Sequence, residues 1–332
     1  MKKLLYISIL LLATSCFKKD AVLPKKSPDS FEINLSIKGN QASYINLTNL
    51  QNSYDGKTAN WHLKFQNDEL GWYIYLNTLQ NVAIHNTTET DYDLVDQDYN
   101  ILDLPWQLDI PASQGSQPAI GEWGDFNFPN PKSFKNVYLI SWNDGITSFV
   151  YKLQILDAST DRYHLRYGTL DGAITKSVWI TKDKEHRHSY FSFKSGSDIQ
   201  IEPKVNDWNF CFTYLQDSII SHKNIPHATT INKSFGLYQG VIINQSNTQI
   251  FLDTSNSFDD IDFFFARDLE YNTIDEIINL FYTWNINSQS IEASENLTLI
   301  TKDENRYYAL KAEELEGSSI EDIRIKLKIK QL

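Results

Sequence analysis

Hydrophobic and polar residues alternate with a period of two along most of the chain. The alternation is clearest near the end, where Ile323, Ile325, Leu327 and Ile329 alternate with basic residues. Successive side chains of a strand point to opposite faces, so this pattern predicts strands with one buried and one solvated face. Strands of this kind are typical of antiparallel sheets. Further alternating runs occur at Leu63/Phe65, Tyr73/Tyr75, Tyr151/Leu153/Ile155, Phe191/Phe193 and Ile250/Leu252.

One short pattern occurs twice. Trp61 to Phe65 and Trp208 to Phe212 both read Trp-x-apolar-x-Phe after a polar residue, and a Ser-Tyr strand precedes each, at Tyr44 and at Tyr190. Several later strands recur in the same order. We therefore predict a mainly β protein with few helices, built as two tandem antiparallel β-sheet domains at residues 31–181 and 183–332.

One helix is predicted in the second half. Thr273-Ile-Asp-Glu276 has the form of a capping box, in which the two side chains bond free backbone donors. Apolar residues follow at helical spacing, at Ile274, Ile277, Ile278 and Phe281.

The first fifteen residues have the pattern of a targeting signal. Two lysines precede an apolar run from Leu4 to Ala13, which is too short to span a bilayer. The run ends in small residues and Cys16, which resembles a bacterial lipoprotein signal. The resemblance implies cleavage before Cys16 and its acylation; an ordinary secretion signal is the alternative. Residues 16–30 are rich in Lys, Asp and Pro and are interpreted as a lipidated tether.

Charge and cysteine content limit the classes of function. The formal net charge is −12, and an acidic surface repels phosphate backbones, so nucleic-acid binding is not expected. With Cys16 acylated, Cys211 has no disulfide partner, and it is interpreted as a packing residue rather than a nucleophile.

Several motifs together resemble the HmuY-like haem-binding lipoproteins. They are the Tyr190 to Gly196 strand, the Trp208 to Phe212 strand, the Tyr238 to Asn244 strand, the late Tyr308 to Leu310 strand and the lipoprotein signal. The resemblance covers the second half best. It implies a β-rich protein that is anchored to the outer membrane or shed from it and captures haem for a TonB-dependent transporter.

Histidines are the candidate haem ligands that the resemblance implies. None of the seven histidines aligns with the family's ligands. His222 and His227 lie in a long polar segment, where ligands are often held, and are the haem-binding candidates; solvated loop histidines are the alternative. His186 and His188 form an H-x-H pair that could reach one metal ion, although an exposed linker is the favoured reading and no metal site is predicted.

Three tryptophans stand in sequence typical of loops. Trp106, Trp123 and Trp142 have Pro, Gly and Asn as neighbours. Exposed aromatic rings stack on sugars, ligands or partner proteins, whereas buried ones anchor loops. No catalytic motif is present, so no enzyme activity is expected.

These observations give a first hypothesis and two alternatives. The first is an outer-membrane surface lipoprotein that binds haem or a related ligand. The second is an accessory subunit of an outer-membrane protein complex that binds no haem. The third is a glycan-binding lipoprotein that uses the three tryptophans.

Overall fold

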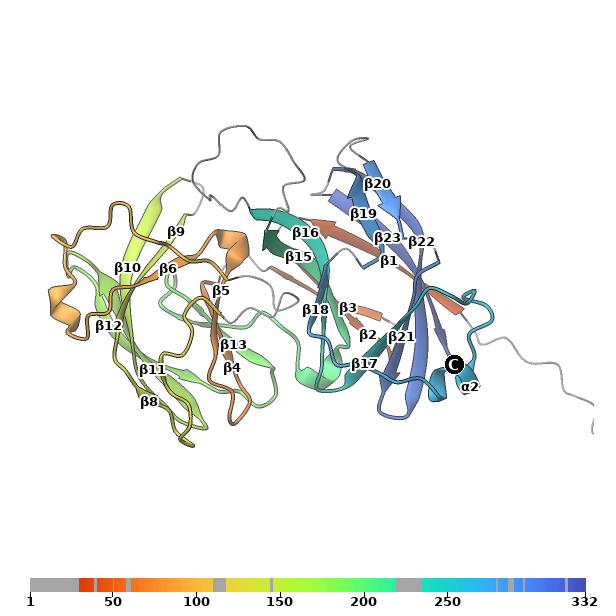
Figure 1. The fold of residues 1–332 in the computed structure, drawn as a ribbon, viewed down its shortest axis with the longest axis horizontal. Helices are drawn as coiled ribbons and strands as arrows, with labels where there is room; N and C mark the ends of the chain where they lie inside the picture. Colours follow the sequence, from red (N-terminus) through yellow and green to blue (C-terminus); the bar gives the residue numbers. More distant parts are fainter. Residues whose placement is uncertain are drawn as a thin grey trace, which may run out of the picture.

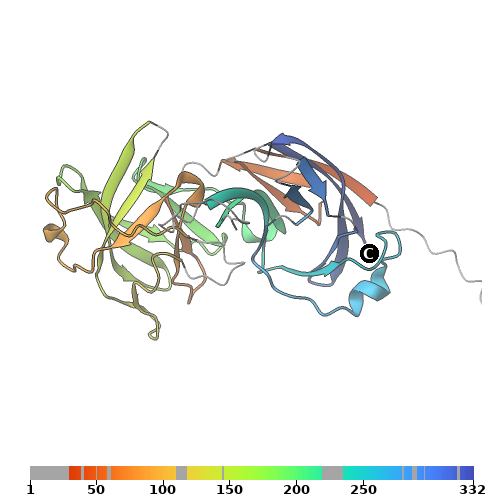
Figure 2. The ribbon, with the colours of Figure 1, turned by 45° about the horizontal axis from the view of Figure 1, so that its top comes forward.

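The computed structural model is mainly β, as the alternation predicts. It describes residues 30–38, 41–49, 51–57, 61–109, 118–143, 146–218, 235–278, 280–285, 290–294, 296–319 and 322–332. The described chain forms two lobes that lie side by side (Figure 1; Figure 2). Within it, the one α-helix is α2 (Phe263–Arg267), which Asp262 caps by accepting a hydrogen bond from the Phe265 N–H.

The first lobe spans residues 61–201 and contains two antiparallel sheets that enclose one core. The five-stranded sheet has the order β12-β11-β10-β9-β6 and the four-stranded sheet has the order β14-β13-β4-β5. The strands are β4 (Leu63–Gln66), β5 (Ile74–Leu76), β6 (Ala83–Asn86), β9 (Val137–Asn143), β10 (Ser148–Ala158), β11 (Arg162–Thr169), β12 (Thr175–Thr181), β13 (His188–Ser192) and β14 (Ser197–Ile199). A small hairpin adds β7 (Gly124–Asp125) and β8 (Lys132–Ser133).

The second lobe combines both ends of the chain. Its two sheets have the orders β1-β23-β22-β21-β17 and β18-β16-β15-β2-β3, and together they enclose a second core. The strands are β1 (Ser30–Lys38), β2 (Gln41–Asn46), β3 (Gln51–Lys57), β15 (Phe210–Ser218), β16 (Phe235–Ile243), β17 (Thr248–Asp253), β18 (Glu276–Ile278), β21 (Thr298–Asp303), β22 (Arg306–Ser319) and β23 (Asp322–Gln331). β19 (Tyr282–Asn285) and β20 (Ser290–Ala293) pair with each other.

Strand pairing corrects the predicted domain boundaries. β1 pairs with β23 over its whole length, and β2 pairs with β15, so residues 30–57 belong with residues 208–332. Conversely, β13 pairs with β4, so residues 188–199 belong to the first lobe. The ranges 31–181 and 183–332 therefore do not coincide with the lobes. The first strands of residues 31–181 belong to the second lobe, which is built mainly from residues 183–332. The first strands of residues 183–332 belong to the first lobe.

Equivalent contacts recur in the two lobes despite this exchange. The Tyr44 ring meets the edge of Trp208 at 5.2 Å, and Trp61 meets Tyr190 at 5.3 Å. The strand that carries Tyr44 pairs with the strand that follows Trp208, just as the Tyr190 strand pairs with the one after Trp61. The repeated sequence pattern thus corresponds to a repeated packing unit.

Buried polar side chains repeat as well. The Asn77 amide donates to the Trp61 carbonyl, and the Asn244 amide donates to the Trp208 carbonyl, each at 2.9 Å. Asn77 follows β5 and bonds the residue before β4, just as Asn244 follows β16 and bonds a residue before β15. The same kind of buried polar group is therefore satisfied in the same way in both lobes.

The predicted helix over residues 273–281 is wrong. Residues 276–278 form the edge strand β18, in which Ile277 pairs with Val241 and Ile278 with Gly240. Three of the four apolar residues are isoleucines, whose branched side chains favour a pleated sheet. Ile274 and Ile277 pack on the core from this position, so the apolar face exists but belongs to a strand.

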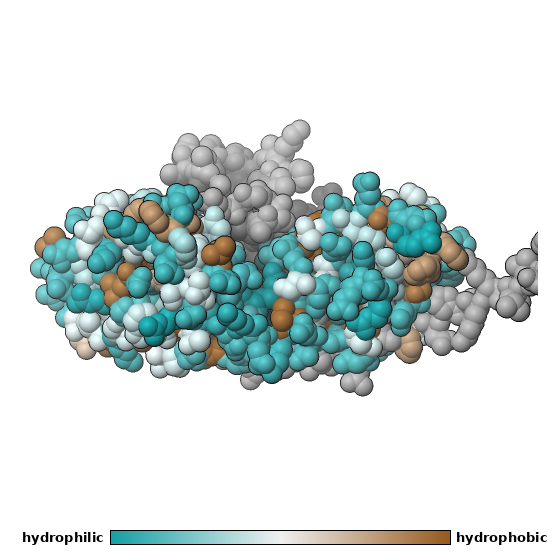
Figure 3. All heavy atoms as spheres, turned by 90° about the horizontal axis from the view of Figure 1, so that it is seen from below, coloured by the Kyte–Doolittle hydropathy of each residue, from teal (hydrophilic) through white to brown (hydrophobic). Residues whose placement is uncertain are grey.

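No helix in the described part of the chain is long and apolar enough to cross a membrane. On the face seen in Figure 3, hydrophobic residues gather in small separate patches within a largely polar surface.

His62 makes the stability of the first lobe depend on pH. Its ring is 4% exposed, and Nδ1 accepts a hydrogen bond from the Phe193 N–H. Burial, and then the charge of Lys194, lowers the pKa of His62 to about 4. Because the folded protein binds fewer protons than the unfolded chain between pH 6.5 and about 4, stability is lost as the pH falls through that window, by about 3 kcal/mol.

The variant His62→Asn tests this expectation. At the equivalent position in the second lobe, Asn209 accepts a hydrogen bond from the Leu47 N–H through Oδ1, at 2.8 Å, so asparagine suits the geometry. Urea unfolding of both proteins at several pH values should show that the free energies of unfolding of wild type and variant diverge below pH 6.5. Parallel pH curves would contradict the assignment.

Candidate functional site

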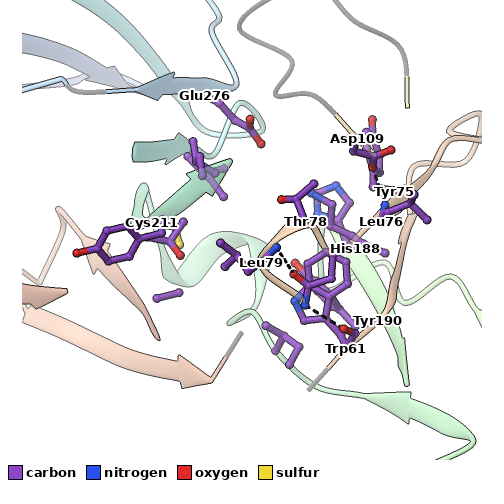
Figure 4. Close-up of a pocket in the computed structure, with 18 of the residues that line it drawn as sticks. Trp61, Tyr75, Leu76, Thr78, Leu79, Asp109, His188, Tyr190, Cys211 and Glu276 are labelled. Atoms are coloured by element: carbon purple, nitrogen blue, oxygen red, sulfur yellow. Dashed lines mark hydrogen bonds between the residues drawn. The ribbon is translucent and has the colours of Figure 1, made fainter. Parts of the chain in front are cut away.

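A cavity of about 130 Å³ lies between the two lobes. It is formed where the outer face of the β14-β13-β4-β5 sheet meets the outer face of the β18-β16-β15-β2-β3 sheet. Figure 4 shows side chains from both lobes converging on this space. Its lining includes Ala42, Tyr44, Trp61, Lys64, Tyr75, Thr78, Asp109, His188, Tyr190, Cys211, Ile242, Asp275 and Glu276.

The wall from the first lobe is aromatic and polar. Trp61 and Tyr190 pack edge to face, and the Tyr75 ring meets His188 at 6.2 Å. The Lys64 ammonium lies 4.7 Å from the centre of the Tyr75 ring, a cation–π contact. Lys64, Tyr75 and Tyr190 occupy paired positions on three neighbouring strands, so the sheet itself sets their spacing.

A buried carboxylate holds this wall in place. Glu202 is 3% exposed and accepts hydrogen bonds from the His188 N–H at 2.6 Å and from the Tyr190 hydroxyl at 3.1 Å. Its other interaction is with His188 Nδ1 at 3.3 Å. Burial alone would raise the pKa of Glu202, but the charge and hydrogen bonds of His188 outweigh it and hold this pKa below its usual value. Glu202 is therefore an ionised anchor for two cavity residues.

Strands β2, β15 and β16 of the second lobe give the cavity a mainly apolar stretch of wall. Where the first lobe has Lys64 between Tyr190 and Tyr75, the second has Cys211 between Tyr44 and Ile242. Cys211 is buried, and burial raises the pKa of its thiol. This environment suppresses the thiolate and agrees with the interpretation of Cys211 as a packing residue.

Carboxylates stand around the cavity from both lobes (Figure 4). The Asp109 carboxylate accepts hydrogen bonds from the Leu76 and Ala119 N–H groups at 2.6 and 2.7 Å. Burial raises the pKa of Asp109 and the two hydrogen bonds lower it, with a net rise to about 6. Asp109 is therefore largely ionised at neutral pH. Asp275 and Glu276 come from β18 and the residue before it.

One ion pair crosses between the lobes at the cavity. Arg187, next to β13 of the first lobe, bonds the Asp275 carboxylate at 2.9 Å and the Ile243 carbonyl at 3.0 Å. Burial alone would raise the pKa of Asp275. The charge and hydrogen bond of Arg187 outweigh burial and hold this pKa below its usual value, so the ion pair neutralises Asp275. The contact fixes how the two walls face each other.

The predicted haem ligands lie outside the described residues. This holds for His222 and His227, and also for the acylation site Cys16. Four described histidines have a ring nitrogen engaged with protein groups: His62, His164, His186 and His188. The fifth, His85, meets the Trp106 ring.

The cavity between the lobes is small for a haem group. Pockets for drug-sized ligands begin at roughly 300 Å³, whereas this cavity measures about 130 Å³.

The three candidate tryptophans do not form a common surface. Trp123 is 1% exposed and donates from Nε1 to the Trp72 carbonyl at 2.8 Å. Trp142 is 5% exposed and stacks on Phe149 and Phe193 within the core. Their prediction as contact residues is corrected, because rings buried in this way are closed to a sugar or a partner. Trp106 is half-buried.

The H-x-H pair does not converge on a metal ion. His186 Nδ1 bonds Asp183 at 2.8 Å, and His188 turns to Glu202. Among the residues that the structure describes, no group of three or more His, Cys, Asp or Glu side chains is placed to hold a metal.

Most cavity residues were missed by sequence reasoning. Tyr44, Trp61 and Tyr190 carried a signal, because they belong to the repeated pattern, but that pattern was read as architecture only. Asp109 stands alone in the sequence, and the capping-box pattern assigned Glu276 to a helix terminus instead of a ligand site. Comparisons with protein-family models, with curated proteins and with solved structures give no match to this chain.

Proposed function

We propose that this protein is a lipid-anchored binding protein that holds a small non-haem ligand in the cavity between its lobes. The observation that supports it is the cavity itself, which collects aromatic, charged and apolar side chains from strands of both lobes. Ligand sites favour domain interfaces and combine an apolar lining with a few oriented polar groups. Glu202 and Arg187 hold the polar groups in fixed positions, as a binding site requires.

The proposed location rests on the lipoprotein signal in the sequence. Acylation of Cys16 would attach the protein to the outer membrane, with residues 16–30 as a tether. A TonB-dependent transporter or another outer-membrane complex is the proposed partner that would receive the ligand. Neither the anchor nor the partner is needed for the cavity to bind.

Filling the cavity tests the proposal. Thr78 lines it, so Thr78→Trp should displace a ligand. Thr175→Trp places the same side chain on the exposed β12 and serves as the control. Native mass spectrometry of protein isolated from its own envelope should show a bound small molecule in wild type and control, and at least a tenfold lower occupancy in Thr78→Trp. Equal occupancy in all three would contradict the proposal.

A haem titration of residues 31–332 separates this proposal from the haem hypothesis. We expect no saturable Soret shift near one equivalent. A saturable shift that is weakened in His222→Ala or His227→Ala would replace the proposed function with haem capture.

A further inference from the structure

The short helix α2 presents two phenylalanine rings to solvent. Phe263 and Phe264 are 40% and 63% exposed, and their rings meet edge to face at 5.7 Å. Among the large apolar side chains exposed in the described part of the chain, they are the one pair adjacent in sequence. Exposed apolar side chains that gather in one place are typical of interaction surfaces.

The remainder of α2 is fixed to the protein. Ala266 is fully buried, and Phe265 packs beside it in the cluster that covers the outer face of the β1-β23-β22-β21-β17 sheet. The Tyr271 hydroxyl donates to the Ala266 carbonyl at 2.8 Å. The Phe263 ring meets the Tyr307 ring at 5.6 Å. The two exposed rings are therefore held in position by buried neighbours.

The start of β1 lies close to this helix. Ser30 pairs with Lys330, and Lys330 pairs with Ala309 on the next strand. Ala309 pairs in turn with Ile300, and both belong to the cluster on which α2 packs. Neighbouring strands are about 4.8 Å apart, so Ser30 lies roughly 10 Å from Ala309. Lys330 also ties the segment before α2 to this row, because its ammonium donates to the Ile261 carbonyl at 2.8 Å.

This end of the molecule is the one that the proposed anchor reaches. The start of β1, α2 and the end of the chain lie together at the end of the second lobe that points away from the first lobe (Figure 1; Figure 2). The segment from Cys16 to Ser30 cannot exceed about 50 Å even when fully extended. The first lobe is joined to the anchor only through β1, β2 and β3 of the second lobe. A bilayer that holds Cys16 therefore meets the surface around α2 more readily than any surface of the first lobe.

The charges around the two rings limit the kind of lipid. Asp259, Asp260, Asp268 and Glu270 are exposed in the same segment. Arg267, the basic residue of α2, forms an ion pair with Asp268 at 2.8 Å. A surface of anionic lipids would repel this acidic rim, whereas zwitterionic lipids carry no net charge against it.

We propose that α2 is a membrane-contact site, at which Phe263 and Phe264 enter the interface of a zwitterionic lipid bilayer and orient the anchored protein. The inference rests on the lipid anchor of the proposed function and adds a second, non-covalent contact to it. Apolar side chains of interfacial helices enter the boundary between headgroups and acyl chains to a depth of about 5–10 Å. In this orientation the cavity between the lobes faces away from the bilayer and stays open to its ligand.

Quenching by labelled lipids tests the contact. The acylated protein is placed in vesicles of phosphatidylcholine and phosphatidylethanolamine, with a nitrobenzoxadiazole label on Phe264→Cys. Cys211 is buried and burial raises its pKa, so the introduced thiol takes the label. Phe128→Cys, at a 53% exposed position of the first lobe, is the matched control. Quenchers on the acyl chains should reduce the fluorescence at least threefold more at position 264 than at position 128.

The lipid composition and the native envelope complete the test. Phosphatidylglycerol in the vesicles should reduce the quenching at position 264 at least twofold, because of the acidic rim. Equal quenching at both positions, in protein that floats with the vesicles, would overturn the inference and leave the lipid anchor standing. A label at position 264 that is shielded in native envelopes but not quenched by lipid would show that a protein covers α2, which also overturns it. Protein that is not acylated and does not float would overturn the anchor and the inference together.

Discussion

A fragment of residues 183–332 is expected not to fold, although it covers a complete predicted domain. It lacks β1, β2 and β3, which pair with β23 and β15. It also loses four side chains of the second core: Ile33, Leu35, Ile45 and Leu47. Burial of each contributes about 1.5–3 kcal/mol, so their loss is comparable with the about 5–15 kcal/mol that stabilises a whole protein.

Two matched fragments provide the controls. Residues 61–201 contain both sheets of the first lobe and should fold alone. Residues 30–57 joined to residues 208–332 by a flexible linker of roughly 15 residues should restore the second lobe. Thermal unfolding followed by circular dichroism should show a cooperative transition for both, and none for residues 183–332. A cooperative transition in that fragment would refute the strand exchange.

The exchange explains how far the fold could be predicted. Period-two alternation identified strands such as β10 and β23 because each has one buried and one solvated face. The Trp61 and Trp208 patterns also pointed to equivalent packing. Alternation does not say which strand is a neighbour, however, since Tyr44 could lie beside either Trp strand. The shorter sequence separation favoured the strand after Trp61, whereas the structure pairs the Tyr44 strand with the strand after Trp208.

The site was less predictable for a related reason. It forms where outer faces of two sheets meet, and those faces look like solvated faces in the sequence. Lys64 alternates with Leu63 and Phe65 just as an exposed lysine would. Glu202 follows β14 in sequence typical of a loop, yet it is buried by contacts with β13. Only the packing of one lobe on the other turns these residues into a site.

Replacing Glu202 by leucine should destabilise the first lobe by about 3–5 kcal/mol, the cost of removing one partner from a buried ionic network. The substitution leaves the His188 N–H and the Tyr190 hydroxyl without their acceptor in a place closed to water. Glu202→Gln keeps one acceptor oxygen and should cost less, about 1–3 kcal/mol. Chemical denaturation of the intact chain measures both values.

Glu185→Leu is the matched control, because its ion pair with Lys204 is exposed and should contribute less than about 1 kcal/mol. The pH dependence separates charge from shape. Since the pKa of Glu202 is lowered in the folded protein, its contribution is present above its unfolded pKa of about 4.3 and is lost as the pH falls below it. The difference in stability between wild type and Glu202→Gln should therefore shrink on acidification below that pH. A difference that does not change with pH would show that Glu202 acts by packing alone, and the aromatic wall of the cavity would then not depend on its charge.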